Sequence, residues 1–162
     1  MKKMLLFSLV VLTFLSCSKT EDHSKENIAL IEKYIESVVN LDSDAMDTIL
    51  ADDYMGYGPS FDQSINKENA ISNWKNTSTD LYKSISYSKN RNIAVSIPDG
   101  ENKGEWVTNW AEATIVYKDS GKEVTFWANT LYQIKNGKIV KSYTIYNEAD
   151  ILKQLNYTFT KE

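Results

Sequence analysis

The sequence of 162 residues has one cysteine, one histidine, two prolines and six glycines. Because Cys17 stands alone, an internal disulfide is excluded and the core must stabilise the fold. The single histidine, His23, excludes a histidine-rich metal site. The sequence also has no glycine-rich phosphate-binding loop and no nucleophile–base motif. We therefore predict that the protein uses neither a metal nor a cofactor.

The charge balance limits the partners of the protein. There are 18 basic and 22 acidic side chains, a formal net charge of −4. Such an acidic chain attracts no nucleic acid, and it is not suited to broad electrostatic docking on anionic lipid headgroups. Any attachment to a membrane would then rest on acyl chains.

The N-terminal segment has the pattern of an export signal. Lys2 and Lys3 precede an apolar run from Met4 to Leu15, which is too short for a permanent membrane span. Phe14, Leu15, Ser16 and Cys17 together resemble the lipobox of bacterial lipoproteins, although the family usually has leucine at the first position. This resemblance implies a lipoprotein signal peptide over 1–16, a lipid on Cys17 and a protein anchored to the cell envelope, on its periplasmic face or at the surface. An ordinary secretory signal is the alternative.

The polar residues 17–25 are predicted to form a flexible tether.

Hydrophobic spacing predicts three helices in the first half of the folded part. From Asn27, apolar residues recur every three or four positions through Val39, which is typical of an amphipathic helix. A second, short helix follows Asp42 and is expected to stop near Asp52 and Asp53. A third begins after Asn66 and carries Trp74 on its apolar side.

From Leu81 the hydrophobic period changes to two, which indicates strands. They are expected over 82–97, 105–118, 122–134 and 138–146, with turns at 119–121 and 135–137, after a brief earlier strand at 54–59. A short helix over 148–155 ends the domain, which spans 26–157. The predicted fold class is α+β, with three N-terminal helices packed on a curved antiparallel sheet.

Several strings resemble the nuclear transport factor 2-like superfamily, which includes ketosteroid isomerases and SnoaL-like polyketide cyclases. They are the sequences over 41–45, 50–54, 66–70 and 132–139, together with Pro59. The resemblance implies a cone-shaped fold with a pocket, a hydrogen-bonding tyrosine at Tyr34 and an aromatic wall at Trp74. The family's acids, however, fall at Gly58, Thr130 and Thr144. Since glycine and threonine cannot replace a carboxylate base, neither family reaction transfers by resemblance.

The resemblance and the strand alternation together predict a ligand pocket. Its expected lining is Tyr34, Tyr54, Tyr57, Trp74, Thr130, Tyr132, Ser142, Thr144 and Tyr146. The alternative for Tyr34 and Trp74 is an ordinary place in the core. For Tyr54 and Tyr57, β-propensity alone is an equal explanation.

The opposite face of the last two strands is unusually apolar for a surface. It carries Trp127, Leu131, Tyr143 and Ile145, which predicts a homodimer through the convex side of the sheet. The alternative is that the two faces are inverted.

Three functions remain open from the sequence. The first is a binding module for a small, mostly apolar molecule, with no catalytic residue. The second is an isomerase, dehydratase or cyclase that uses Glu112 or Asp53 as a replacement base. Glu112 is a candidate because a carboxylate buried on its strand would have a raised pKa, and Asp53 is one by residue type, although an acid at a helix end is usually solvated or a cap. The third is a dimeric structural or partner-binding domain whose pocket is filled by its own side chains.

Overall fold

The structure is a computed structural model and describes residues 23–158. Within this range the chain forms four α-helices, one π-helical turn (η1) and six strands. In order they are α1 Ser24–Val39, α2 Ser43–Ile49, β1 Leu50–Tyr57, β2 Ser64–Asn66, α3 Lys67–Asn76, η1 Thr77–Leu81, β3 Tyr82–Ile97, β4 Gly104–Tyr117, β5 Glu123–Lys135, β6 Lys138–Tyr146 and α4 Glu148–Gln154. Within residues 23–158, no helix is long and apolar enough to cross a membrane.

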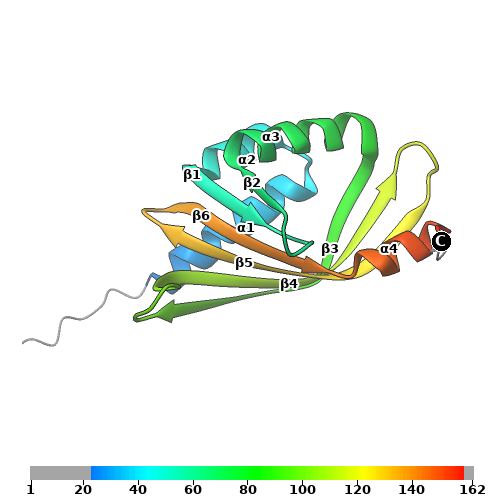
Figure 1. The fold of residues 1–162 in the computed structure, drawn as a ribbon. Coiled ribbons are helices and arrows are strands. Elements are labelled where there is room, and N and C mark those ends of the chain that lie inside the picture. The colour runs from blue at the N-terminus through cyan, green and yellow to red at the C-terminus, as the bar shows by residue number, and fades with distance from the viewer. Residues whose placement is uncertain (1–22, 159–162) are drawn as a thin grey trace, which may run out of the picture.

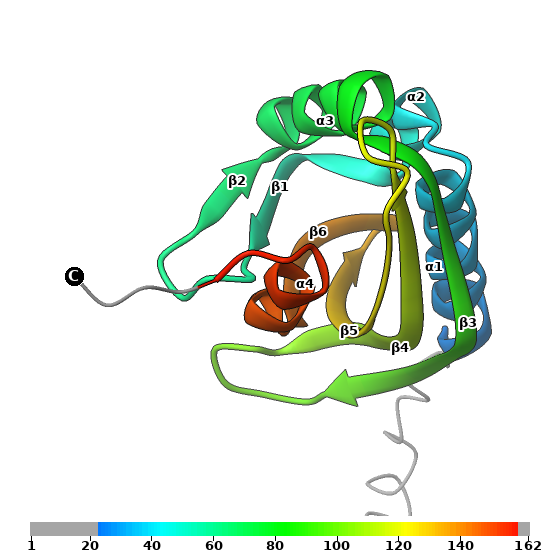
Figure 2. The ribbon, with the colours of Figure 1, turned by 90° about the vertical axis from the view of Figure 1, so that its right-hand side faces the viewer.

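The six strands form one bent sheet in the order β2-β1-β6-β5-β4-β3. Every neighbouring pair is antiparallel except β1 and β6, which run parallel. Helix α1 lies along β3 and β4, while α2 and α3 cover the end at β1 (Figures 1 and 2). The predicted α+β class, with helices layered on a curved sheet and a short C-terminal helix, is confirmed.

Side-chain caps explain where three of the helices begin. The Asp42 carboxylate accepts a hydrogen bond from the backbone N–H of Ala45 at 2.9 Å, and Asn66 accepts one from Asn69 at 3.0 Å. Asn147 does the same for α4. Each cap satisfies a donor that the first turn of a helix leaves free, so these polar residues fix the register of the helices that follow.

The four long strands lie within one residue of their predicted bounds. The turn between β5 and β6 is a two-residue connection in which Asn136 and Gly137 have φ values of 54° and 69°. Such left-handed residues are what a type I′ hairpin requires. Strand β3 is interrupted between Ser88 and Arg91, where Lys89 has a φ of 51°. This irregularity lies within the one long strand that the sequence also allowed as a bent pair.

Two helix boundaries differ from prediction, β1 spans Leu50–Tyr57 where a strand and turn were predicted at 54–59, and β2 was not predicted. Helix α2 stops at Ile49, and Asp52 and Asp53 belong to β1, because Leu50 is already extended, is buried and pairs with Ile139 of β6. Helix α1 starts at Ser24, so the last two residues of the predicted tether are helical. The rest of that tether, Cys17 and the predicted signal lie outside the described residues, apart from His23 at the N-cap of α1.

Candidate functional site

A hollow of about 350 Å³ lies between the helices and the inner face of the sheet. Eight of the nine residues predicted to line a pocket lie around it: Tyr34, Tyr54, Trp74, Thr130, Tyr132, Ser142, Thr144 and Tyr146. Tyr34 comes from α1 and Trp74 from α3, while the other six come from β1, β5 and β6. The hollow is therefore built by segments from both halves of the domain.

Strand pairing brings the polar residues of the hollow together. Tyr132 pairs with Ser142 and Thr130 with Thr144, so these four side chains share the inner face of β5 and β6. The hydroxyls of Thr130 and Thr144 are 3.3 Å apart. On β1, the Tyr54 hydroxyl lies 2.7 Å from Ser142 Oγ.

Aromatic rings form much of the remaining wall. Tyr34 and Tyr132 meet edge to face, with ring centroids 5.6 Å apart and an interplanar angle of 69°. Phe126 lies behind Tyr146 with a centroid separation of 5.3 Å. The first contact is edge to face and the second is tilted, at 54°, and both are within the range in which aromatic rings attract each other.

The residues that line the hollow have no group that is charged at neutral pH. Among them are six tyrosines, Trp74 and three threonines, but no acid, lysine, arginine or histidine. Burial raises the pKa of the Tyr34 phenol well above its ordinary value, and neighbouring tyrosines raise it further. Burial also raises the pKa of Tyr132, and it raises that of Tyr87 to about 12. These phenols are therefore neutral hydrogen-bonding groups and not bases.

The position of the family's base is closed to any side chain. Gly58 has a φ of +96°, and a Cβ atom there would lie 2.2 Å from the carbonyl oxygen of Thr144. Only glycine allows this approach of the two backbones. The family's acid is therefore absent from a position where the chain after β1 passes too close to β6 for a side chain.

Tyr57 does not line the hollow, contrary to prediction. It lies on the outer face of the sheet and stacks on Tyr143, with centroids 5.0 Å apart and an angle of 20°. The reason is strand alternation: Tyr54 points inward on β1, so a residue three positions later must point outward. The spacing of the two tyrosines already contained this information.

Glu112 is not a buried base. Its carboxylate lies on the outer face, opposite Trp127 of β5. It is 2.8 Å from the Lys89 ammonium and accepts a hydrogen bond from Ser88. These hydrogen bonds, from Lys89 first and Ser88 second, lower the pKa of Glu112, the opposite of what was expected. A carboxylate stabilised in its charged form away from the hollow cannot remove a proton from a ligand inside it.

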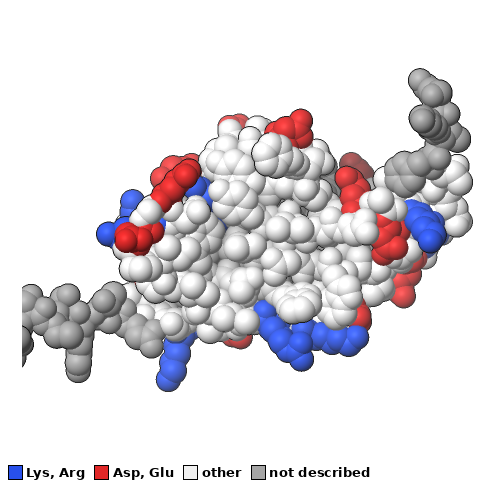
Figure 3. Space-filling model, turned by 60° about the horizontal axis from the view of Figure 1, so that its bottom comes forward, with Lys and Arg blue, Asp and Glu red and all other residues white. Residues whose placement is uncertain are grey.

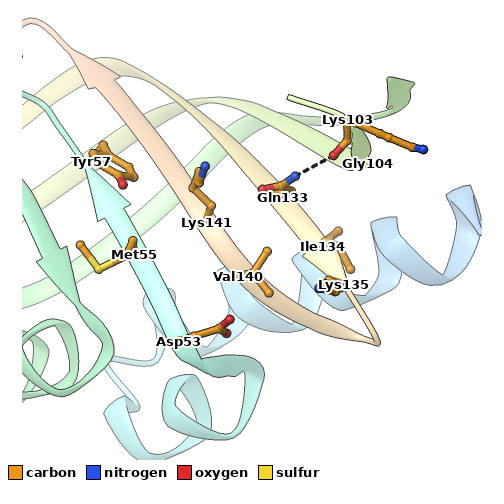
Figure 4. Close-up of a pocket in the computed structure, with 10 residues that line it drawn as sticks. All are labelled: Asp53, Met55, Tyr57, Lys103, Gly104, Gln133, Ile134, Lys135, Val140 and Lys141. Carbon is orange, nitrogen blue, oxygen red and sulfur yellow. Dashed lines mark hydrogen bonds between the residues drawn. The ribbon is translucent and has the colours of Figure 1, made fainter. Parts of the chain in front are cut away.

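Asp53, the other candidate base, is exposed and lies on the far side of β1 from the hollow. It borders a separate groove of about 650 Å³, with Met55 and Tyr57 beside it and Lys141 on the neighbouring strand (Figure 4). In that groove the Gln133 side chain donates a hydrogen bond to the Lys103 carbonyl at 3.1 Å. The structure thus places both candidate bases outside the pocket, and the described residues contain no cluster of metal-binding side chains.

Sequence reasoning missed other residues of the hollow. They are Val38, Gly58, Pro59, Ile65, Ala70, Asn73, Thr77, Tyr82 and Tyr87. Helical spacing could have found Val38 and Ala70, which lie four residues from Tyr34 and Trp74. Tyr82 and Tyr87 are an odd number of residues apart, and a register shift between Tyr82 and Ser84 is what lets both face inward.

The outer face of the sheet carries the four residues predicted there. Trp127 and Ile145 are 53% and 59% exposed, and Trp110 on β4 is 55% exposed. Trp110 and Trp127 meet edge to face at 5.9 Å. Seen from below the strands of Figure 1, the surface is mostly uncharged at its centre, with acidic and basic side chains around its margin (Figure 3).

Comparison with known proteins now identifies the family. The sequence model of the SnoaL-like polyketide cyclase family matches residues 28–155. The chain belongs to this family. No curated protein matches the sequence at a significant level.

Solved structures agree with this membership in the SnoaL-like family. A protein assigned as a polyketide cyclase from Xanthomonas campestris pv. campestris has 15% identity and a TM-score of 0.67, covering 82% of this chain and 98% of its own. An LEH-like epoxide hydrolase from M. tuberculosis has 16% identity and a TM-score of 0.63, covering 83% and 92%. A protein with a ketosteroid isomerase-like fold from Catenulispora acidiphila, solved with trimethylamine, has 13% identity and a TM-score of 0.62, covering 82% and 97%. At these identities the likeness establishes the nuclear transport factor 2-like fold.

Proposed function

We propose that this SnoaL-like domain binds a small, mostly apolar molecule in the hollow beside Tyr34 and Trp74 and does not act as an acid–base catalyst. One observation carries the proposal: the hollow is open and aromatic, yet its lining has no group that is charged at neutral pH. Its volume of about 350 Å³ lies at the lower end of the range for small-molecule sites. The open volume also argues against a pocket filled by its own side chains.

The enzyme alternative lacks a base within reach. A general base must come within hydrogen-bond distance of the proton that it removes, directly or through one water molecule. Glu112 and Asp53 are both on the opposite face of the sheet, and Gly58 cannot carry a side chain. Neutral phenols can orient a ligand oxygen but cannot accept its proton at neutral pH.

Equilibrium dialysis with 2-acetylnaphthalene tests the proposal. This probe is planar, apolar and uncharged. We expect the wild-type protein to bind it and Trp74→Ala to weaken the binding by roughly tenfold or more, because an aromatic wall is lost. Trp110→Ala is the matched control, since it removes an indole from the outer face. Equal weakening by both variants, or no binding by the wild type, would contradict the proposal.

We also propose that the outer face pairs with a second copy of the chain. Two features of this face fit each other: the exposed pair Trp110 and Trp127, and a hollow of about 360 Å³ bordered by Trp106, Leu131 and Tyr143. Asn129 lies between the two features and borders both. A two-fold axis near Asn129 would put the indoles of each copy against the hollow of the other. The uncharged centre and charged margin suit such an interface.

For the N-terminal segment, we propose export and lipid attachment at Cys17, which would anchor the domain to the cell envelope. The support is the sequence alone: a positive start, a short apolar run and a cysteine after Ser16. An apolar ligand held near a membrane is consistent with such an anchor.

A further inference from the structure

Four of the polar groups of the hollow form a small array of hydroxyls on three adjacent strands. The hydroxyls of Tyr54 on β1 and Ser142 on β6 are hydrogen-bonded at 2.7 Å, and those of Thr144 on β6 and Thr130 on β5 are 3.3 Å apart. Ser142 and Thr144 are two residues apart, so both pairs lie on the same face of the sheet. All four residues border the hollow.

Each pair has hydrogen-bonding capacity left for a ligand. A hydroxyl has one donor and two acceptor positions. When two hydroxyls bond to each other, one O–H is used and the other remains free to donate. The array can therefore donate to a ligand oxygen while it keeps its own two hydrogen bonds.

The same array is poorly suited to a charged ligand. A carboxylate or an ammonium group that leaves water loses several kcal/mol of hydration unless an opposite charge meets it. No lysine, arginine, histidine, aspartate or glutamate lines the hollow. Neutral hydroxyls and aromatic rings offset only part of that loss.

We infer that the pocket selects an uncharged molecule whose apolar body carries a carbonyl or hydroxyl oxygen, and that it rejects the corresponding carboxylate. The oxygen lies at the hydroxyl array of Tyr54, Ser142, Thr130 and Thr144, and the apolar body lies against Tyr34 and Trp74. This inference rests on the proposed function, and it adds the chemical class of the ligand.

Three probes of nearly equal shape test this selection by equilibrium dialysis at pH 7. They are 2-acetylnaphthalene, 2-naphthoate and 2-isopropylnaphthalene, which differ in having a carbonyl, a carboxylate and no oxygen. We expect 2-naphthoate to bind at least roughly tenfold more weakly than 2-acetylnaphthalene. The hydrocarbon should bind roughly three- to tenfold more weakly, because it leaves the free O–H groups without a partner.

A matched pair of variants tests the hydroxyl array itself. Thr144→Val removes one hydroxyl from the hollow with little change of shape and should reduce the advantage of 2-acetylnaphthalene over the hydrocarbon, since three of the four hydroxyls remain. Thr125→Val is the control, because Thr125 and Thr114 form a similar hydroxyl pair, 2.9 Å apart, on the outer face. This control should leave the ratio of the two affinities unchanged.

The possible outcomes distinguish a failure of the inferred ligand selectivity from a failure of the proposed binding function. Binding of 2-naphthoate as tight as that of 2-acetylnaphthalene would overturn the inference and leave the binding function intact. Equal affinity for the ketone and the hydrocarbon would do the same. If none of the three probes binds, the proposed function fails, and the inference fails with it.

Discussion

The hydroxyls of Tyr54 and Ser142 lie 2.7 Å apart across the parallel junction of β1 and β6. Ser142 pairs with Gly56 and not with Tyr54, so the phenol reaches its partner by lying over the glycine. A Cβ atom at Gly56 would be 2.6 Å from the Tyr54 hydroxyl oxygen. The missing side chain at Gly56 therefore makes room for a hydrogen bond that forms part of the pocket wall.

Substituting Gly56 should break this arrangement. We expect Gly56→Ala to lower the free energy of unfolding by about 1–3 kcal/mol, since the phenol must move and both hydroxyls lose a buried partner. Urea unfolding measures the effect. In a Tyr54→Phe background the same substitution should cost less, because the atom that clashes is absent. Strict additivity of the two substitutions would contradict this explanation.

Gly58 and Gly100 provide a comparison of backbone contact. Both have positive φ values, +96° and +81°, but only Gly58 has a neighbour, the Thr144 carbonyl, where a Cβ would lie. Gly100→Ala should cost about 1 kcal/mol from backbone strain alone. Gly58→Ala should cost at least about 3 kcal/mol, because β1 and β6 must separate. Similar unfolding midpoints for the two variants would show that the contact is unimportant.

Most elements of the fold and about half of the residues that line the pocket could be predicted from the sequence, in part because a period of two assigns faces along β5 and β6. This alternation by itself predicts that Thr130 and Tyr132 share one face of their strand, and that Ser142 and Thr144 share one face of theirs. The prediction for Tyr57 was wrong because it rested on the nearness of Tyr57 to Gly58 and did not apply alternation. Alternation left Glu112 undecided because the face of β4 depends on its register with β5, which only the folded sheet supplies.

Contacts between backbone segments could not be predicted from the sequence. Nothing local in the chain reveals that Gly58 touches Thr144, or that the shift near Ser84 turns Tyr82 and Tyr87 toward the same hollow. Both depend on pairing between segments distant in sequence. The neutral character of the pocket follows from these contacts, since they exclude an acid at Gly58 and add phenols from β3.

Lipid attachment predicts where the protein is found in cells. With Cys17 intact, the protein should partition with the membrane fraction and gain the mass of acyl chains. Cys17→Ser should abolish this gain of mass, because the thiol that accepts the lipid is absent. Mass spectrometry of the purified N-terminus checks the modification. Thr20→Ser, in the predicted tether, leaves residues 14–17 unchanged and controls for general effects on export.

Pairing through the outer face predicts a change of mass in solution. Trp127→Lys should convert a dimer into a monomer, because it puts a charge where the indole of one copy would enter the apolar hollow of the other. Size-exclusion chromatography with light scattering measures this. Phe61→Lys is the control: Phe61 is fully exposed on the connection between β1 and β2. A wild-type protein that is monomeric at high micromolar concentration would rule out the interface.

The buried phenols predict how stability responds to alkaline pH. Burial raises the pKa of Tyr34, Tyr82 and Tyr132 above that of an unfolded tyrosine, and it raises the pKa of Tyr87 to about 12. Above about pH 10 the unfolded chain loses phenolic protons that the folded chain keeps. This contribution to stability is therefore complete below pH 10 and is lost as the pH rises toward 12.

Urea unfolding at a series of pH values measures this dependence. Each such tyrosine should lower the free energy of unfolding by about 1.4 kcal/mol per pH unit within that window. Tyr87→Phe should make this decline of stability shallower. Around neutral pH its stability should be independent of pH, as in the wild type.

Binding of 2-acetylnaphthalene, which does not ionise, should stay constant from about pH 6 to pH 9, since no group of the pocket titrates there. A step in affinity within that range would reveal an ionisable group at the site and restore the case for an acid–base catalyst.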